Sequence, residues 1–206
     1  MTSLPLLQGK SVSASTFNPH SQTPLFYLET ARTICRIAQP QDVASVLTYM
    51  ERNRAFLTPF EPIKPDGYFT LPFWRQQIQW DHSDFRHGRR WRIFIFDRQT
   101  QDVIGVAHFS NILRAALQAC SLGYSLDEGR GGQGLMTEAL SAVIPEVFRQ
   151  LKLHRIQANY MPSNKASGRV LEKLGFQVEG QARQYLRING QWEDHVLTSL
   201  INPDDV

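Results

Sequence analysis

A cluster of four glycines in the middle of the chain carries the strongest chemical signal in the sequence. Gly129, Gly131, Gly132 and Gly134 lie in EGRGGQGLM, and an apolar run follows them directly. Glycine loses more conformational entropy on folding than other residues, and it is generally used where the backbone turns tightly or approaches a ligand. The first amide N–H groups of a helix have no intrahelical acceptor, so a glycine-rich helix start can bind a phosphate group. The alternative is a plain turn that leads into a helix.

Two familiar phosphate-binding motifs do not fit this cluster. A Walker P-loop requires Gly-Lys-Ser/Thr, whereas Leu135 and Met136 follow the last glycine here. A dinucleotide-binding fingerprint lies beside the first strand, whereas several predicted strands precede this cluster. The sequence therefore predicts a phosphate cradle of a different type.

The cysteines and histidines indicate neither a metal site nor a thiol nucleophile. The two cysteines, Cys35 and Cys120, each lie in an apolar strand-like run, which favours buried thiols in a reducing compartment over a disulfide. Cys120 has no partner residue at a spacing typical of nucleophilic catalysis. No Cys and His spacing typical of metal ligands occurs. We therefore expect no metal cofactor.

The composition predicts one main globular unit. A chain of 206 residues with 42% hydrophobic residues can bury one sizeable core. Residues 1–24 are rich in Ser, Thr, Pro and Gln and are expected to form a loosely held N-terminal arm. Residues 25–206 are expected to form a single domain.

Charge and hydropathy argue against nucleic-acid and membrane partners. The 22 basic and 19 acidic residues give a formal charge of +3 without the basic stripe that nucleic-acid binding requires. The densest basic run, residues 86–92, leads into an apolar segment and is interpreted as the start of a strand. The first residues lack the features of a signal peptide, and no run is long enough to span a membrane. We expect a soluble cytoplasmic protein, and the sequence carries no signal for its oligomeric state.

The first half of the chain predicts a strand, two helices and three strands. Alternating side chains indicate a strand at 31–38, and Pro40 opens a helix that continues to residue 56. A second helix is expected over 71–85. Three strand-like runs then follow, at 90–97, 102–113 and 118–126.

The second half begins with the helix that the glycines open. Apolar residues recur at helical spacing from Leu135 to Leu151, and Pro145 inside this helix is expected to kink or divide it. A strand is expected over 154–161 and a helix over 164–174, with Asn164 as its N-cap and Gly175 just beyond its end. The last two strands flank the hairpin turn at 189–190.

This order of elements, with YSLDEG leading into GGQGLM, resembles the GNAT family of acetyl-CoA-dependent N-acetyltransferases over residues 31–201. The resemblance implies an α/β (α+β) fold: a mixed, mostly antiparallel sheet, splayed at the acetyl-CoA site and flanked by helices. The family loop reads Gln/Arg-x-x-Gly-x-Gly/Ala, and Gly134 matches its central glycine. Gly131 stands in the first position, with Arg130 one residue earlier, and Met136 stands in the last.

Further segments resemble the RimJ-like subgroup, the ribosomal-protein-alanine N-acetyltransferases. These segments are NRAFLTPFEP, GVAHFSN, GYSL, GQGLMTEAL, HRIQANYMPSNKASG and INGQWEDHVLTSL. The resemblance implies that the acceptor is the N-terminal alanine of a ribosomal protein. One alternative is a GNAT enzyme for a small-molecule amine. The other is a ribosome assembly or binding factor, against which the absence of a basic stripe argues.

The resemblance also implies which residues hold acetyl-CoA. The strand segment Tyr124, Ser125 and Leu126 would pair with the pantetheine arm and polarise the thioester oxygen with its amides. The phosphates would lie on the backbone amides of the loop and helix start. Asn164 would contact the pantetheine, and its alternative role is an ordinary helix N-cap. The predicted cofactor-binding residues are Tyr124, Ser125, Leu126, Gly131, Gly132, Gln133, Gly134, Leu135, Met136, Thr137 and Asn164.

Direct transfer, in which a neutral amine attacks the thioester, requires a proton donor for the departing thiolate. Ser167, one turn after Asn164, is the candidate, because Leu171 stands where many relatives have a tyrosine. The alternative for Ser167 is a hydroxyl that caps the helix start. Tyr160 is the second candidate donor. Arg169 and Lys173 either approach the phosphates or form a solvated helix face.

The proton acceptor is less clearly indicated. The strand 118–126 carries no carboxylate, unlike relatives that place a Glu there. Glu61, in the loop FLTPFEP, is the best candidate, since loops after the first helices form the acceptor wall in this family. Glu51, Asp194 and a water-mediated path are alternatives. His195 is interpreted as structural.

Overall fold

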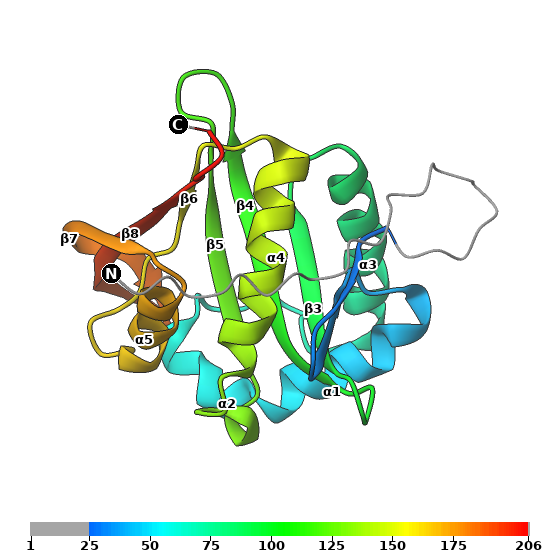
Figure 1. Cartoon of the computed structure of the whole chain (residues 1–206). Helices are drawn as coiled ribbons and strands as arrows, with labels where there is room; N and C mark the ends of the chain where they lie inside the picture. The colour runs from blue at the N-terminus through cyan, green and yellow to red at the C-terminus, as the bar shows by residue number, and fades with distance from the viewer. Residues whose placement is uncertain (1–24, 206) are drawn as a thin grey trace.

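The computed structural model describes residues 25–205, so the predicted N-terminal arm at 1–24 lies outside the described residues. Its central feature is an eight-stranded sheet with the order β1-β2-β3-β4-β5-β6-β8-β7 (Figure 1). Every neighbouring pair is antiparallel except β5 and β6, which are parallel. The predicted mixed, mostly antiparallel sheet is therefore confirmed. The single domain over 25–206 stays a prediction.

The strands lie at the predicted segments, although those expected at 31–38 and 154–161 are only four and three residues long. They are β1 Tyr27–Glu29, β2 Thr33–Arg36, β3 Trp91–Asp97, β4 Val103–Leu113, β5 Ala119–Leu126, β6 Arg155–Gln157, β7 Gln177–Ile188 and β8 Gln191–Ile201. The short edge strand β1 was not predicted. It has three residues, and only the middle one is partly buried, so its sequence shows little alternation.

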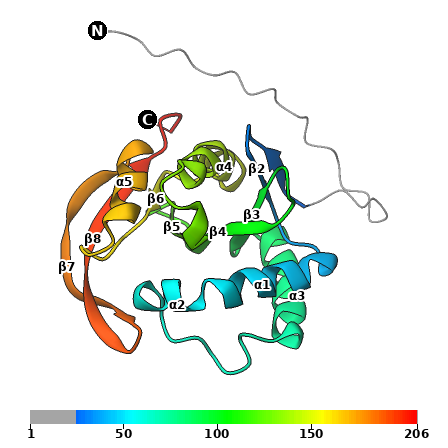
Figure 2. The same cartoon turned by 90° about the horizontal axis from the view of Figure 1, so that it is seen from below.

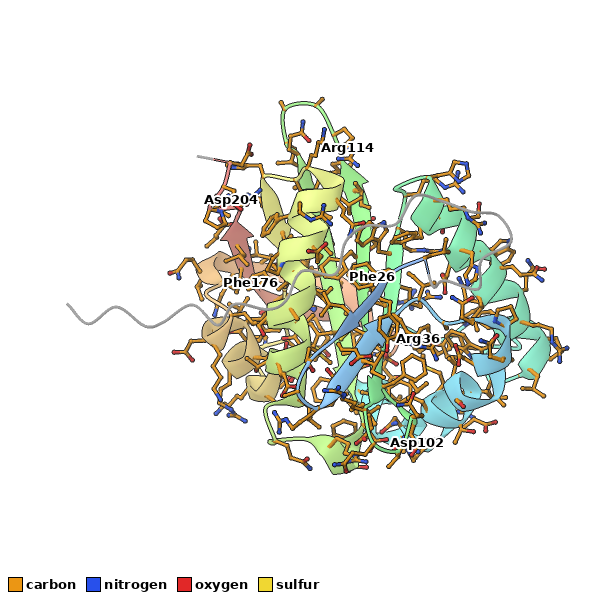
Figure 3. The ribbon with its side chains drawn as sticks, turned by 45° about the vertical axis from the view of Figure 1, so that its right-hand side comes forward. Phe26, Arg36, Asp102, Arg114, Phe176 and Asp204 are labelled. Carbon is orange, nitrogen blue, oxygen red and sulfur yellow. The ribbon has the colours of Figure 1, made fainter. Side chains whose placement is uncertain are left out.

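The helices cover both faces of the sheet. They are α1 Val43–Arg52, α2 Arg54–Leu57, α3 Leu71–Arg86, α4 Leu135–Leu151 and α5 Lys165–Lys173, with short 3-10 turns at Pro40–Asp42, Thr58–Phe60 and Glu128–Arg130. Figure 2 shows α4 and α5 on one side of the sheet and α1 and α3 on the other. The core accordingly has two parts. Phe26 and Phe176 both belong to the part under α4, and Figure 3 shows the side chains that fill these layers.

Side chains alternate between the two faces of a strand, and helices cover both faces of the sheet, so the middle strands are buried on both faces. In β3, Ile93 and Ile95 pack under α4, whereas Phe94 and Phe96 pack under α1 and α3. The same alternation in β4 sends Ala107 to the α4 side and Val106 to the α1 side. Ser125 and His108, described below, lie on the α1 side of the sheet.

Two predicted helix features need correction. Pro145 does not divide α4, which runs without interruption from Leu135 to Leu151. Proline has no N–H, so the Ser141 carbonyl lacks its helical hydrogen-bond donor. Pro145 and Ser141 are both exposed, so water can replace the missing hydrogen bond. Ile144 and Val147 are buried and hold the helix against the core. The helix predicted over 40–56 is also interrupted, at Asn53.

Asn53 explains this interruption. It is 1% exposed, and its amide donates to the Tyr49 carbonyl (2.9 Å) and to the Asp127 carboxylate (3.1 Å). Its side-chain oxygen accepts from the Glu128 N–H (3.0 Å). A single side chain thus ends α1 and ties it to the segment that leads into the glycine cluster.

The sheet splays open after β5 begins. Strand β5 pairs with β6 over only three residues, Ala119 to Ser121, and within 25–205 the following part of β5 pairs with β4 alone. Beyond β6, the chain continues beside β8 through the Tyr160–Val196 bridge. Residues 123–126 therefore have a free backbone edge, and the predicted splay is confirmed.

The last two strands form a long hairpin that reaches back across the molecule. Asn189 and Gly190 both have positive φ, 43° and 84°, as the hairpin prediction requires. Figure 2 shows this hairpin curving toward the loop after α2. There the Asn189 N–H donates to the Glu61 carbonyl at 3.0 Å.

The role of Asn53 leads to a stability prediction. Asn53→Ala should lower the free energy of unfolding by about 2 kcal/mol, because it leaves buried partners without hydrogen bonds. The urea midpoint of unfolding measures this loss. Gln79→Ala on the exposed side of α3 is the control and should change the midpoint little. An Asn53→Ala midpoint equal to that of the control would contradict the assignment.

Candidate active site

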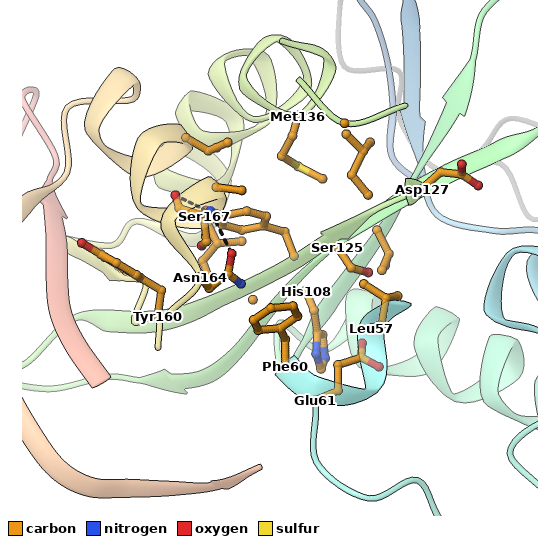
Figure 4. Close-up of a pocket in the computed structure, with 18 of the residues that line it drawn as sticks. Leu57, Phe60, Glu61, His108, Ser125, Asp127, Met136, Tyr160, Asn164 and Ser167 are labelled. Atoms are coloured by element: carbon orange, nitrogen blue, oxygen red, sulfur yellow. Dashed lines mark hydrogen bonds between the residues drawn. The ribbon is translucent and has the colours of Figure 1, made fainter. Parts of the chain in front are cut away.

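A cavity of about 650 Å³ lies where β5 leaves β6. Its wall is formed by the free edge of β5, the glycine loop, the starts of α4 and α5, strand β4 and the loop after α2 (Figure 4). The predicted residues on this wall are Glu61, Tyr124, Ser125, Leu126, Gly131, Gly132, Gly134, Leu135, Met136, Thr137, Asn164 and Ser167. Residues from distant parts of the sequence thus meet in one cavity.

Gln133 is the predicted cradle residue that does not line the cavity. Its side-chain amide donates back to the Gly129 carbonyl (3.3 Å), and its own carbonyl accepts from Arg32 (2.9 Å). Arg130 forms an ion pair with Asp97 (3.1 Å). It lies one residue before Gly131, the position at which the family motif has Gln or Arg. Neither side chain is therefore placed as a cap over the cradle.

The glycine loop owes its shape to two left-handed residues. Gly132 has φ 73°, and Gly134, the N-cap of α4, has φ 76°. A Cβ at Gly132 would meet nothing within 4 Å, so backbone strain and not crowding requires glycine there. The turn leaves the first N–H groups of the 17-residue helix α4 facing the cavity end of the loop, where the helix dipole favours an anion.

Glu138 in the first turn of α4 holds this loop to the β1–β2 turn. Its carboxylate accepts from the Thr30 hydroxyl (2.7 Å), the Arg32 N–H (2.8 Å) and the Arg32 guanidinium (2.7 Å). Burial alone would raise the pKa of Glu138, but the Thr30 and Arg32 hydrogen bonds outweigh burial and hold that pKa below its usual value. The ion pair fixes the cradle from outside.

The free edge of β5 is supported from both faces of the sheet. On the α1 side, the Ser125 hydroxyl is hydrogen-bonded to the buried Tyr49 hydroxyl (2.9 Å). On the other side, the Tyr124 hydroxyl is hydrogen-bonded to the Ser167 hydroxyl (2.8 Å) and donates to the Ser167 carbonyl (3.0 Å). Both side chains are thus occupied, and the backbone edge between them remains free.

Ser167 does not cap its helix. Asn164 caps α5, because its side-chain oxygen accepts from the Ser167 N–H (3.1 Å). The Ser167 hydroxyl lines the cavity and pairs with Tyr124, whose pKa is raised above its usual value by burial. Two protonated hydroxyls therefore lie in sequence at the cavity wall.

Tyr160 and the remaining candidates on α5 also line the cavity. Tyr160 packs against Gly168, where a Cβ would lie 2.9 Å from its ring, and it lines the wall. Arg169 and Lys173 line the wall as well, and neither forms an ion pair within the part of the chain that the structure describes. Their positive charges are thus available to an anionic ligand.

Of the candidate carboxylates, only Glu61 lines the cavity. It forms an ion pair with Lys64 (2.8 Å), and its loop is held by the hairpin tip. Asp194 instead accepts from the Gln184 N–H (2.8 Å), and Glu51 is exposed on α1. His195 is 4% exposed and has its Nδ1 at 3.0 Å from the Glu193 carbonyl.

His108 is a polar cavity residue that the sequence analysis did not identify. His108, in the middle of β4, lines the wall, and its Nε2 is buried without a hydrogen-bond partner among residues 25–205. Burial and the nearby Arg92 and Arg90 lower its pKa to about 3, so the imidazole is neutral. The available signal was an ionisable residue in the middle of a predicted strand.

Thiol chemistry has no support at this site. Cys120 and Cys35 are buried, and burial raises the pKa of each to about 12. Among residues 25–205, no group of three or more His, Cys, Asp or Glu side chains is arranged to hold a metal ion. No helix within that range has the length and apolar character needed to cross a membrane.

Comparison with known proteins agrees with this geometry. The acetyltransferase (GNAT) domain family matches residues 32–177. The chain is 41% identical to "[Ribosomal protein uS5]-alanine N-acetyltransferase" of Escherichia coli (strain K12), over 91% of this chain and 97% of that protein. It is 40% identical to "Probable N-acetyltransferase YjcK" of Bacillus subtilis (strain 168), over 80% of this chain and 91% of that protein.

Solved structures match as well. The ribosomal-protein-S5-alanine acetyltransferase from Vibrio fischeri superposes with a TM-score of 0.83 at 37% identity, covering 87% of this chain and 98% of that one. Mycobacterium smegmatis RimJ in complex with CoA-disulfide gives a TM-score of 0.77 at 27% identity, covering 84% and 83%. Fold, cavity and sequence agree, and the chain belongs to the GNAT family of acetyltransferases.

Proposed function

We propose that this acetyltransferase transfers the acetyl group of acetyl-CoA to the N-terminal α-amine of a ribosomal protein that begins with alanine. The observation that carries the proposal is the free edge of β5, which leads directly into the glycine loop. The relatives named for uS5-alanine acetylation, which align over 97% of their length, support the acceptor.

The residues present fit acetyl-CoA. The unpaired backbone of residues 123–126 provides strand-like hydrogen bonds for the pantetheine arm, and the N–H groups from Gly132 to Thr137 suit the pyrophosphate. Arg169 and Lys173 add positive charge to the same wall. This assignment keeps the predicted cofactor residues, with Gln133 acting through its backbone.

The chemistry then requires two proton transfers. A neutral amine attacks the thioester carbonyl, and the amides of the β5 edge stabilise the oxygen that becomes negative. The amine loses a proton to a base, for which Glu61 is the candidate carboxylate. As the carbon–sulfur bond breaks, the sulfur receives a proton from the Ser167 hydroxyl. The Ser167 oxygen is then reprotonated by the Tyr124 hydroxyl, to which it is hydrogen-bonded.

The weak base favours an α-amine over a lysine. An α-amine has a pKa of about 7.8 and lysine about 10.4, so deprotonation at neutral pH costs about 1 and about 4.6 kcal/mol respectively. The Glu61 carboxylate also forms an ion pair with Lys64, which competes with the amine proton for its oxygens. A site with this base is therefore suited to the more acidic ammonium group.

The cradle gives the first test. Gly134→Val should weaken acetyl-CoA binding roughly tenfold or more. A residue with a side chain in the left-handed region costs about 1–2 kcal/mol, and a β-branched residue such as valine is the least tolerated there. Calorimetric titration measures the affinity. Gly129→Ala, in the same loop but without a positive φ, is the matched control and should bind normally. Unchanged affinity in Gly134→Val would remove the loop from the cofactor site.

The hydroxyl pair gives the second test. Ser167→Ala should reduce kcat by roughly 10²–10⁴, as is typical of general acid–base groups, with little change in acetyl-CoA affinity. Tyr124→Phe should act on the same step, so that the double variant loses less than the product of the two single effects. Ser163→Ala, exposed before α5, is the control. Near-normal turnover in Ser167→Ala would exclude it as the proton donor.

Peptide substrates test the acceptor. A lysine-free peptide that begins with alanine should be acetylated by radiolabelled acetyl-CoA, and its N-terminally blocked, lysine-containing counterpart should not. A small amine that reacts better than the alanyl peptide would favour the small-molecule alternative. Equal labelling of the blocked peptide would show that the α-amine assignment is wrong.

A further inference from the structure

His108 lies one strand in from the free edge of β5. In the register of the sheet it is opposite Arg92 on β3 and opposite Gly123 on β5. Residues opposite one another in a sheet point to the same face, here the α1 side. Gly123 has no side chain, and a Cβ there would meet nothing within 4 Å. The space between His108 and the edge that suits the thioester is therefore open.

The wall around His108 presents polar nitrogen atoms without hydrogen-bond partners among the described residues. The buried Nε2 of His108 has no partner among the described residues, and neither has the buried indole N–H of Trp74, which lines the same cavity. A buried polar group without a partner costs about 1–3 kcal/mol, and such groups are rare in folded proteins. Figure 4 shows His108 among the residues that line the cavity, with Phe60 and Glu61 also labelled. A ligand in the cavity would supply the missing acceptor.

The charges around His108 favour an oxygen over an ammonium group. Arg92 on β3, Arg90 just before that strand and Lys64 in the loop after α2 all disfavour positive charge there, and Asp84 on α3 opposes them only in part. Asp81 is engaged by Arg92 (3.0 Å), and Glu61 is engaged by Lys64 (2.8 Å). A neutral imidazole of such low basicity is a poor proton acceptor, but it remains a good hydrogen-bond donor.

We propose that His108 donates its Nε2–H to the first carbonyl oxygen of the acceptor and thereby selects α-amines over lysine side chains. In an α-amine the carbonyl carbon is two bonds from the nitrogen, whereas the ε-amine of lysine is flanked only by methylene groups. The hydrogen bond places the amine against the edge of β5. This inference rests on the proposed function and makes His108 a specificity-determining residue.

The experiment compares two acceptors. One is an alanyl peptide, and the other is the same peptide with a trans CH=CH group in place of its first CO–NH, which removes the carbonyl without adding charge. His108→Leu removes the donor, His108→Gln keeps an N–H donor, and Ser110→Ala, on the same strand face, is the control. Steady-state kcat/KM is measured for each protein with each acceptor.

His108→Leu should lower kcat/KM for the alanyl peptide by roughly five- to 150-fold, the effect of an unpaired carbonyl, and should leave the alkene peptide unchanged. His108→Gln should retain most of the preference, and Ser110→Ala all of it. An equal loss for both peptides, with a shifted pH profile, would instead indicate a proton-transfer role and would overturn the inference.

A second readout does not depend on turnover. In ¹⁵N-histidine-labelled protein with CoA bound, the His108 Nε2 resonance, assigned by its loss in His108→Gln, should shift when the alanyl peptide is added. It should not shift with the alkene peptide. An unshifted resonance would overturn the inference even if acetylation occurs. Failure of the unmutated protein to acetylate the alanyl peptide would count against the proposed function instead.

Discussion

The early separation of β5 from β6 is the constraint on which the rest of this structure depends. The two strands share only three residue pairs, and residues 123–126 of β5 are left with one unpaired backbone edge. Backbone N–H and C=O groups require partners, so an unpaired edge beside a cavity forms a ready binding surface for an extended ligand. The glycine loop continues from this edge, so the two together can bind one elongated ligand.

Such an edge has to be held from its surroundings, since β6 does not support it. Tyr49 holds Ser125 from the α1 side, and Ser167 holds Tyr124 from the α5 side. Asn53 fixes the end of the strand through Asp127, and Arg32 fixes the following helix through Glu138. Each contact joins segments that are far apart in the sequence. The edge is therefore preorganised by tertiary contacts and not by sheet pairing.

Burial keeps the reactive groups of the cavity uncharged. It raises the pKa of the Tyr124 hydroxyl, and it lowers the pKa of the His108 imidazole. Hydroxyls and imidazole thus act as neutral hydrogen-bonding groups at neutral pH. Charged groups at the wall occur where they have a partner, as in Glu61 with Lys64, or where α5 places Arg169 and Lys173 beside the cradle.

The sequence by itself determined most of the elements and the glycine loop, because both depend on local patterns. Periodicity predicted α3 and the β3–β5 meander. Glycines marked the loop and the hairpin turn, where the structure has positive φ. Only the tertiary structure decided which side chains meet. The Ser167–Tyr124 pair, and the position of Glu61 but not Asp194 on the cavity wall, depend on contacts between distant segments. His108 is the clearest case, since its burial, its missing partner and its opposition to Gly123 exist only once three strands are in register.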